Sequence, residues 1–149
     1  MEDINLMDVG DMMKLLENDK KTIFSGEVVH GRKIGRTIGF PTANLHVGSL
    51  LEAFCHLKGV YGVRVHHGAM KYNGVMNIGR RPTFKGEEPK LSIEVHILHF
   101  DQDIYGEQLE IDVLFFIRDE RAFDTIDHLV EQVRNDIKVA NVKFLLTNV

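Results

Sequence analysis

The feature that most restricts the folds open to this chain is a period of two in its apolar residues, repeated between residues 23 and 117. In the first segment, residues 23–29, Phe24, Gly26 and Val28 fall on one side and the intervening residues on the other. Because successive side chains of a β-strand point to opposite faces, this alternation predicts a strand. Further strands are predicted in residues 60–66, 70–78, 91–100 and 109–117.

Short connections join these predicted strands in pairs. Residues 67–69, His-Gly-Ala, separate the second strand from the third, and a short glycine-containing connection is typical of a β-hairpin. Residues 101–107 join the last two predicted strands. No helical pattern alternates with the strands, so a parallel α/β sheet is disfavoured.

The period of the apolar residues changes at the two ends of the chain. Near the C-terminus, the residues that share one stripe of a predicted amphipathic helix are Ile126, Leu129, Val130, Val133 and Ile137. Asp124 or Thr125 is suited to cap that helix, and residues 8–19 predict a second, short helix. Five or six strands followed by one amphipathic helix favour an antiparallel barrel whose open side or end the helix covers.

Length and charge narrow the classes of function. The 149 residues suit one compact domain, and the net charge of −4 disfavours nonspecific nucleic-acid binding, which depends on clustered Lys and Arg. No apolar run reaches the roughly 20 residues needed to cross a membrane, and the acidic start of the chain lacks the basic region of a secretory signal. We therefore expect a cytoplasmic protein without a membrane partner.

The single cysteine, Cys55, is interpreted as a packed or idle thiol.

Glycines and basic residues gather in residues 26–39. Glycines at 31, 35 and 39 let the backbone approach a ligand closely, and His30, Arg32, Lys33 and Arg36 supply positive charge suited to a small anion. Residues 26–33 space two glycines as a Walker A loop does, but Arg-Lys stands where Lys-Ser/Thr is required, so that motif is excluded. A phosphate cradle and an ordinary surface loop both remain open.

The next segment, Gly-Phe-Pro-Thr-Ala-Asn-Leu at residues 39–45, offers two side-chain oxygens. Pro41 fixes the backbone, and Thr42 and Asn44 would point to one side of an extended chain. Mg²⁺ prefers hard oxygen ligands and keeps waters and substrate phosphates, so these two residues suit a magnesium site. The alternative is a proline turn with ordinary side-chain capping.

The eight histidines invite a transition-metal hypothesis. His96 and His99 differ by an odd number of positions, so in a regular strand they face opposite sides and cannot share one zinc ion. The neighbouring His66 and His67 fail in the same way. We therefore expect no transition metal.

Residues 26–45 resemble the signature of the riboflavin kinase family, including the kinase module of bacterial bifunctional riboflavin kinase/FMN adenylyltransferases. Further blocks resemble that family in the same order, at residues 59–63, 77–84, 94–96 and 109–123. The resemblance implies a mainly β fold, a six-stranded antiparallel Greek-key barrel with a C-terminal amphipathic helix. It divides the chain into an N-terminal linker or helix, residues 1–22, and a kinase domain, residues 23–149.

The same resemblance implies an ATP-binding transferase of FMN biosynthesis that moves the γ-phosphoryl group of ATP, with Mg²⁺, to the ribityl 5′-hydroxyl of riboflavin. Glu94 becomes the catalytic base, although a solvated strand glutamate beside Ser92 and His96 is the plain alternative. Thr42 and Asn44 become ligands of the metal and the phosphates. The other residues implied in binding nucleotide or flavin are Gly26, Gly31, Lys33, Gly35, Phe40, Pro41, Asn77, Ile78, Gly79, Arg81, Phe116 and Arg118.

Other functions are weighed beside this one. Bacterial relatives usually carry an FMN adenylyltransferase domain as well, but its His-x-Gly-His motif is absent here, so FAD synthesis is not expected. The chain would be a stand-alone kinase or the C-terminal half of a longer protein. A non-catalytic flavin-binding regulatory module is disfavoured by the intact Thr42, Asn44 and Glu94, and a nucleic-acid-binding barrel by the acidic charge.

Overall fold

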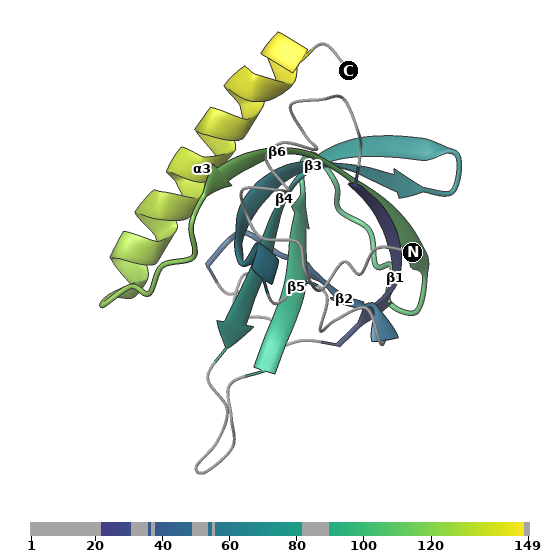
Figure 1. The fold of residues 1–149 in the computed structure, drawn as a ribbon, viewed down its shortest axis with the longest axis horizontal. Helices are drawn as coiled ribbons and strands as arrows, with labels where there is room; N and C mark the ends of the chain where they lie inside the picture. Colours follow the sequence, from purple (N-terminus) through teal and green to yellow (C-terminus); the bar gives the residue numbers. More distant parts are fainter. Residues whose placement is uncertain are drawn as a thin grey trace.

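In the computed structural model, the described residues are 22–30, 36, 38–48, 54, 56–81 and 90–147. They form a six-stranded barrel with one long helix along its outside (Figure 1). The helix predicted at residues 8–19, and nearly all of the linker predicted at residues 1–22, lie outside the described residues.

The barrel is closed by six strands, β1 (Thr22–Val29), β2 (Ala43–His46), β3 (Gly59–His67), β4 (Met70–Arg81), β5 (Lys90–Ile97) and β6 (Gln108–Arg118). Their order around the barrel is β1-β2-β5-β4-β3-β6, and each neighbouring pair is antiparallel. β3, β4 and β5 are consecutive in sequence and in space, while β6 returns to pair with β3, as in a Greek key. The predicted six-stranded antiparallel Greek-key barrel is confirmed.

The interior of the barrel is filled by the inward residues of the alternating pattern. In β1, Phe24 and Val28 are each only 6% exposed, whereas their neighbour Ile23 is 54% exposed. The residues that are fully buried in the barrel include Val63, Val65, Met76, Ile93, Val95 and Ile111. The predicted alternation in β1 and β5 is therefore correct, and it leaves the polar residues of these strands on the outer wall.

Three predictions about strands need correction. The strand predicted at residues 91–100 ends at Ile97, because Leu98 packs against the helix while Phe100 packs against the barrel core, so regular alternation cannot continue. His99 turns the chain between them with a φ of 56°. In the predicted hairpin, His67 pairs with Met70, which leaves a turn of only two residues. β2 was not predicted as a strand, since four residues are too few to show a period.

The helix α3 (Ile126–Thr147) begins at a predicted cap, since the Thr125 hydroxyl accepts a hydrogen bond from the His128 N–H at 3.1 Å. Its predicted apolar stripe is only partly correct. Leu129, Val130, Val133 and Ile137 are half-buried, but Ile126 is 66% exposed because it borders a cavity rather than the packed core. The helix also continues to Thr147, well beyond the predicted stripe.

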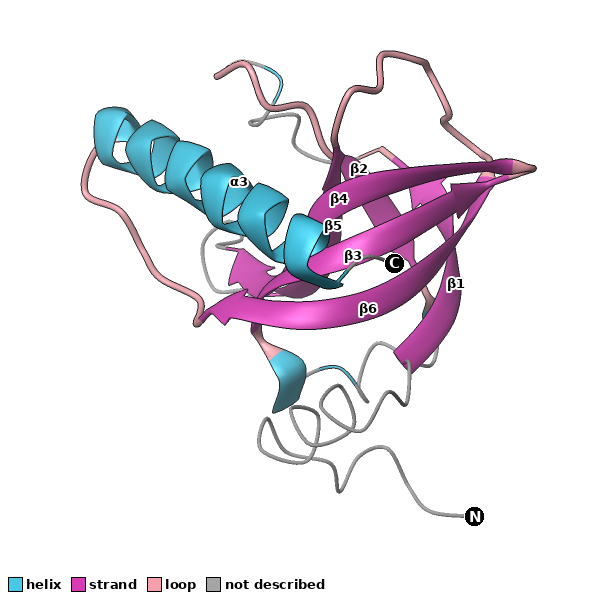
Figure 2. Ribbon diagram, turned by 90° about the horizontal axis from the view of Figure 1, so that it is seen from above, coloured by secondary structure: helices cyan, strands magenta, loops and turns pink. Residues whose placement is uncertain are grey.

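The second half of α3 fixes the helix to the outer wall of the barrel. Ala140 and Phe144 are buried in a small cluster with Leu98 and Phe115, and the rings of Phe115 and Phe144 lie 5.0 Å apart. Gly62 makes room for this contact, since a Cβ there would lie 2.1 Å from the Phe115 ring. Seen from above, α3 lies on the side of the barrel away from β1 (Figure 2). Within the described part of the chain, no helix is both long and apolar enough to span a bilayer.

Candidate active site

A cavity of about 630 Å³ lies between the outer wall of β4 and β5 and the first half of α3. The strand residues that line it are Val60, Val75, Asn77, Gly79, Arg80, Ser92, Glu94, His96 and Arg118, and the helix residues are Ile126, Leu129, Val133, Asp136 and Ile137. Its volume falls in the range of roughly 300–1,000 Å³ that is usual for small-molecule sites. The cavity has a polar wall from the barrel and a largely apolar wall from the helix.

Strand register places the predicted base in the middle of this polar wall. Glu94 of β5 stands opposite Asn44 of β2 on one side and opposite Asn77 of β4 on the other. Residues directly opposite in antiparallel strands share a face, so these three side chains form one row across the outer wall. Glu94 is half-buried there, and Asn44 is only 7% exposed.

Thr42 joins this row from the segment before β2. Its hydroxyl Oγ1 donates a hydrogen bond to Glu94 Oε1 at 3.2 Å. The residues predicted to hold metal and phosphate, Thr42 and Asn44, therefore lie beside the predicted base and on the same wall of the barrel.

The segment that carries Thr42 is held in place by His96. The His96 Nδ1 atom lies 2.8 Å from the carbonyl oxygen of Pro41, and because a carbonyl only accepts, Nδ1 carries the proton of this bond. The ring of Phe40 also meets the His96 ring edge-on, with the centroids 5.8 Å apart. His96 was not predicted as a site residue, since the Pro41 contact joins positions far apart in the sequence.

The opposite end of the polar wall contains a second carboxylate, from Glu120. Its Oε2 accepts a hydrogen bond from the backbone N–H of Arg80 at 3.0 Å. A Cβ on Gly79 would lie 2.1 Å from that oxygen, so the glycine is required for the carboxylate to reach the strand. The structure thus gives Gly79, a predicted site residue, a definite steric role, and it adds Glu120 to the site.

Arg118, at the end of β6, forms an ion pair with Asp136 of α3, and both residues line the cavity. Its Nε and Nη2 atoms donate to the two oxygens of Asp136 at 2.8 and 2.9 Å, and Nη1 donates to the Asp119 carbonyl at 3.0 Å. Asp136 is only 3% exposed, and Gln132 adds a further hydrogen bond to Asp136 Oδ1. Arg118 was predicted to contact flavin, and the structure adds an anchoring role that the sequence did not reveal.

Some of the predicted site residues line the cavity, and others lie elsewhere in the barrel. The described residues Phe40, Thr42, Asn77, Gly79, Glu94 and Arg118 line the cavity, but Gly26, Pro41, Asn44, Ile78 and Phe116 do not. Ile78 is a core residue, and Phe116 packs edge-on against Tyr61 at 5.4 Å. Gly31, Lys33, Gly35 and the side chain of Arg81 lie outside the described residues.

Tyr61 is a structural neighbour of the site and has no part in its proton chemistry. Its hydroxyl donates to the Leu57 carbonyl at 2.8 Å. Burial, and then the negative charge of Asp119, raises the pKa of Tyr61 to about 12. The phenol therefore stays neutral at physiological pH.

The donor set of this wall is suited to a hard divalent cation. Thr42 and Asn44 offer neutral oxygens, Glu94 offers a carboxylate, and oxygen is the ligand atom that Mg²⁺ prefers. The barrel and these oxygen donors together define a small β-barrel protein with a candidate ligand site beside its C-terminal helix.

The family model described as riboflavin kinase (Flavokinase) matches residues 18–144. The chain belongs to the riboflavin kinase family. The RNA-binding riboflavin kinase RibR of Bacillus subtilis is 40% identical over 86% of this chain and 54% of its own length. The bifunctional riboflavin kinase/FMN adenylyltransferase of the same organism is 46% identical over 74% of this chain, but over only 35% of its own length.

A solved structure, riboflavin kinase from Trypanosoma brucei, has the same fold. It superposes with a TM-score of 0.61 at 25% identity, covering 83% of this chain and 79% of the trypanosome chain. This chain spans 54% or less of the Bacillus relatives, so their full activities do not transfer to it directly.

Proposed function

We propose that this chain is a riboflavin kinase that transfers the γ-phosphoryl group of ATP to the ribityl 5′-hydroxyl of riboflavin, giving FMN and ADP. One observation carries the proposal beyond family membership: Glu94 accepts a hydrogen bond from Thr42 and stands in register between Asn44 and Asn77, on the wall of a cavity of about 630 Å³. A base, two oxygen ligands and a small-molecule cavity are thereby within reach of one another.

In the proposed reaction, Glu94 accepts the proton of the ribityl hydroxyl as that oxygen attacks the γ-phosphorus. The new O–P bond forms while the bond to the bridging oxygen breaks, and ADP leaves. Thr42 and Asn44 would hold Mg²⁺, which supplies positive charge to the β- and γ-phosphates. A hydroxyl can use a lone pair on a cation while its hydrogen points elsewhere, so Thr42 can orient Glu94 at the same time.

We propose that the isoalloxazine ring, the flat aromatic part of riboflavin, lies against the apolar side of the cavity. Leu129, Val133 and Ile137 of α3 face Val60 and Val75 across it. A flat aromatic ligand between apolar walls, with a few polar groups at its edge, fits the usual character of such sites. Asn77 is the proposed edge contact, because it lies in the cavity directly beside Glu94.

The FMN adenylyltransferase activity and the RNA binding named for the Bacillus relatives are not proposed for these 149 residues. We expect both to reside in the parts of those proteins that this chain does not cover. Because ATP is a cytoplasmic substrate, the cytoplasm is the proposed compartment.

The direct test is incubation of the protein with riboflavin, ATP and MgCl₂, followed by chromatographic separation of FMN from riboflavin. We expect FMN to accumulate with ATP consumed in equal amount. Riboflavin binding without FMN formation would instead identify a non-catalytic flavin-binding module, and the absence of both would overturn the proposal.

A further inference from the structure

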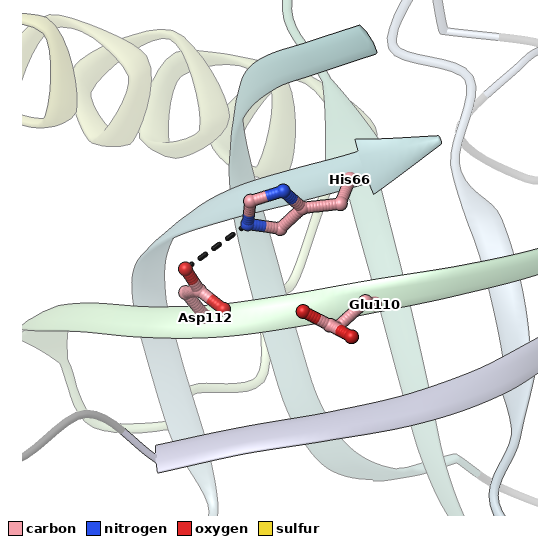
Figure 3. A group of neighbouring side chains, drawn as sticks. All are labelled: His66, Glu110 and Asp112. Carbon is pink, nitrogen blue, oxygen red and sulfur yellow. Dashed lines mark hydrogen bonds and ion pairs between the residues drawn. The ribbon is translucent and has the colours of Figure 1, made fainter. Parts of the chain in front are cut away.

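A group of three potential ligands lies outside the cavity, on the β3–β6 wall. His66 extends from β3, and Glu110 and Asp112 extend from β6, with one ligand atom of each residue within 4.8 Å of the others. Figure 3 shows the two carboxylates beside each other on β6 and the imidazole of His66 next to Asp112. None of the three lines the cavity of the proposed kinase site.

Strand pairing explains why these side chains meet. Glu110 and Asp112 are two positions apart in β6, so both point outward while Leu109, Ile111 and Val113 fill the core. His66 stands opposite Glu110 in the β3–β6 register, which places it on the same outer face. Backbone geometry therefore brings the three side chains to one face of the barrel, and the rotamer of the exposed Glu110 sets the remaining distances.

Asp112 is an acidic residue on the outer wall that is only 7% exposed. Its Oδ2 accepts a hydrogen bond from His66 Nε2 at 3.0 Å, but its Oδ1 is buried and has no hydrogen-bond partner among the residues that the structure describes. Buried polar atoms are nearly always paired, and a buried carboxylate oxygen without a partner is unfavourable. A hydrogen-bond donor or a cation at this oxygen would therefore be stabilising.

The neighbours of Asp112 do not satisfy that oxygen. Ile23, which is opposite Asp112 on β1, has no polar side-chain atom. Arg64, which is opposite Asp112 on β3, donates from Nε to Asn73 Oδ1 at 3.1 Å. Since Asp112 Oδ1 remains unpaired, a cation bound between the carboxylates and His66 would provide the missing partner.

We propose that His66, Glu110 and Asp112 form a binding site for one divalent transition-metal ion of the zinc class. One imidazole and two carboxylates are ligands that Zn²⁺ accepts, whereas Mg²⁺ and Ca²⁺ favour oxygen alone. With Zn–ligand bonds of roughly 2.0–2.2 Å, tetrahedral ligand atoms lie about 3.3–3.6 Å apart. Glu110 is exposed, so its side chain can rotate to close the remaining gap.

The three protein ligands leave a fourth position for water. On binding, the His66 Nε2 lone pair goes to the metal and the ring carries its single proton on Nδ1: a neutral ring changes tautomer through solvent, and a protonated ring releases its Nε2 proton to solvent. The ion would then link β3 to β6. We expected no transition metal from the sequence because the histidine pairs within one strand point to opposite faces. Ligands contributed by two paired strands were not part of that argument.

The test is calorimetric titration of chelator-treated protein with Zn²⁺, without ATP, combined with Co²⁺ titration read by visible absorption. We expect one Zn²⁺ per chain that millimolar Mg²⁺ does not displace, and a Co²⁺ spectrum typical of mixed nitrogen and oxygen ligands. His66→Gln and Glu110→Gln should each weaken Zn²⁺ binding by about 100-fold or more, since loss of even a supporting partner costs roughly 10–100-fold. Zn²⁺ should raise the melting temperature of the wild type and not that of His66→Gln.

The matched controls are His67→Gln and Glu107→Gln, which break the adjacent pair between His67 Nε2 and Glu107 Oε1. That pair offers only two ligands, so its loss should leave the Zn²⁺ affinity unchanged. Asp112→Asn is a further variant, and if it does not fold, the exposed Glu110 variant decides the question. The absence of Zn²⁺ binding in the wild type, or wild-type Zn²⁺ affinity in both His66→Gln and Glu110→Gln, would overturn the proposal.

Discussion

The two outer walls of the barrel present their carboxylates in opposite ways. On the β4–β5 wall, Glu94 accepts a hydrogen bond from Thr42 and borders an open cavity. On the β3–β6 wall, Asp112 is buried beside His66 and keeps one oxygen unpaired. Strand alternation points both carboxylates outward. They differ in burial, since Glu94 is half-buried at the edge of a cavity and Asp112 is buried.

This difference separates two kinds of chemistry. A half-buried carboxylate next to a cavity can exchange a proton with a bound molecule, and it needs no permanent partner. A buried carboxylate with an unpaired oxygen favours a permanent cation. The following variants test this contrast, beginning with the largest expected effect.

Glu94→Gln should reduce FMN turnover by about 10²–10⁴-fold, because the amide cannot accept the proton of the attacking hydroxyl. Riboflavin binding, measured by quenching of flavin fluorescence, should stay close to that of the wild type. Zn²⁺ affinity should also be unchanged, since Glu94 lies on the other wall. Glu131→Gln, an exposed position on α3, is the control. Turnover near the wild-type value in Glu94→Gln would remove Glu94 from the role of base.

Arg118→Met should destabilise the protein by about 3–5 kcal/mol, because the buried Asp136 carboxyl group loses its ion-pair partner and keeps only the hydrogen bond from Gln132. The free energy of unfolding is measured by urea denaturation. Arg121→Met is a matched control, since both arginines lie over the ring of Phe123 but only Arg118 pairs with Asp136. An equal loss of stability in the two variants would show that the ion pair is not the anchor of α3.

Thr42→Ala should raise the Mg²⁺ concentration required for half-maximal FMN formation by roughly tenfold, as expected for loss of one hydrogen bond or ligand to a charged group. Thr42→Ser keeps the hydroxyl and should restore most of the wild-type value. A magnesium titration with an unchanged midpoint in Thr42→Ala would contradict the ligand assignment.

His96→Ala should have a smaller effect, a rise of about two- to tenfold in the KM for ATP with little change in kcat. The variant loses one hydrogen bond to Pro41, which is typically equivalent to about 0.5–1.5 kcal/mol. His96→Asn retains a donor and should recover part of the affinity. The control is His99→Ala, in the exposed turn after β5. A fall in kcat without a change in KM would assign His96 a role other than positioning.

Sequence patterns were sufficient for the barrel because strands such as β1 and β5 alternate regularly between residues inside the barrel and residues on its outer wall. Phe24 and Val28, and the row through Ile93 and Val95, point inward as predicted. The pattern failed where packing changes sides within a few residues. Leu98 and Phe100 have the same parity but pack in different clusters, and β2 is too short to show a period.

The site was predictable in part for a similar reason. The resemblance to a known family identified the short motif around Thr42 and the glutamate at position 94, and the strand register brings them together. Contacts that join distant elements could not be predicted from periodicity. Asp136 meets Arg118 only because α3 folds back onto β6, and Glu120 reaches Arg80 only because Gly79 leaves space.

Closure of the barrel also affects how this fold can be combined with others. Each of the six strands has an antiparallel neighbour on both sides, so the wall offers little unpaired backbone to which another polypeptide could add a strand. A longer protein can therefore carry this unit beside other folded modules with little risk of intermolecular sheet formation. Contacts between such modules would have to be made through side chains.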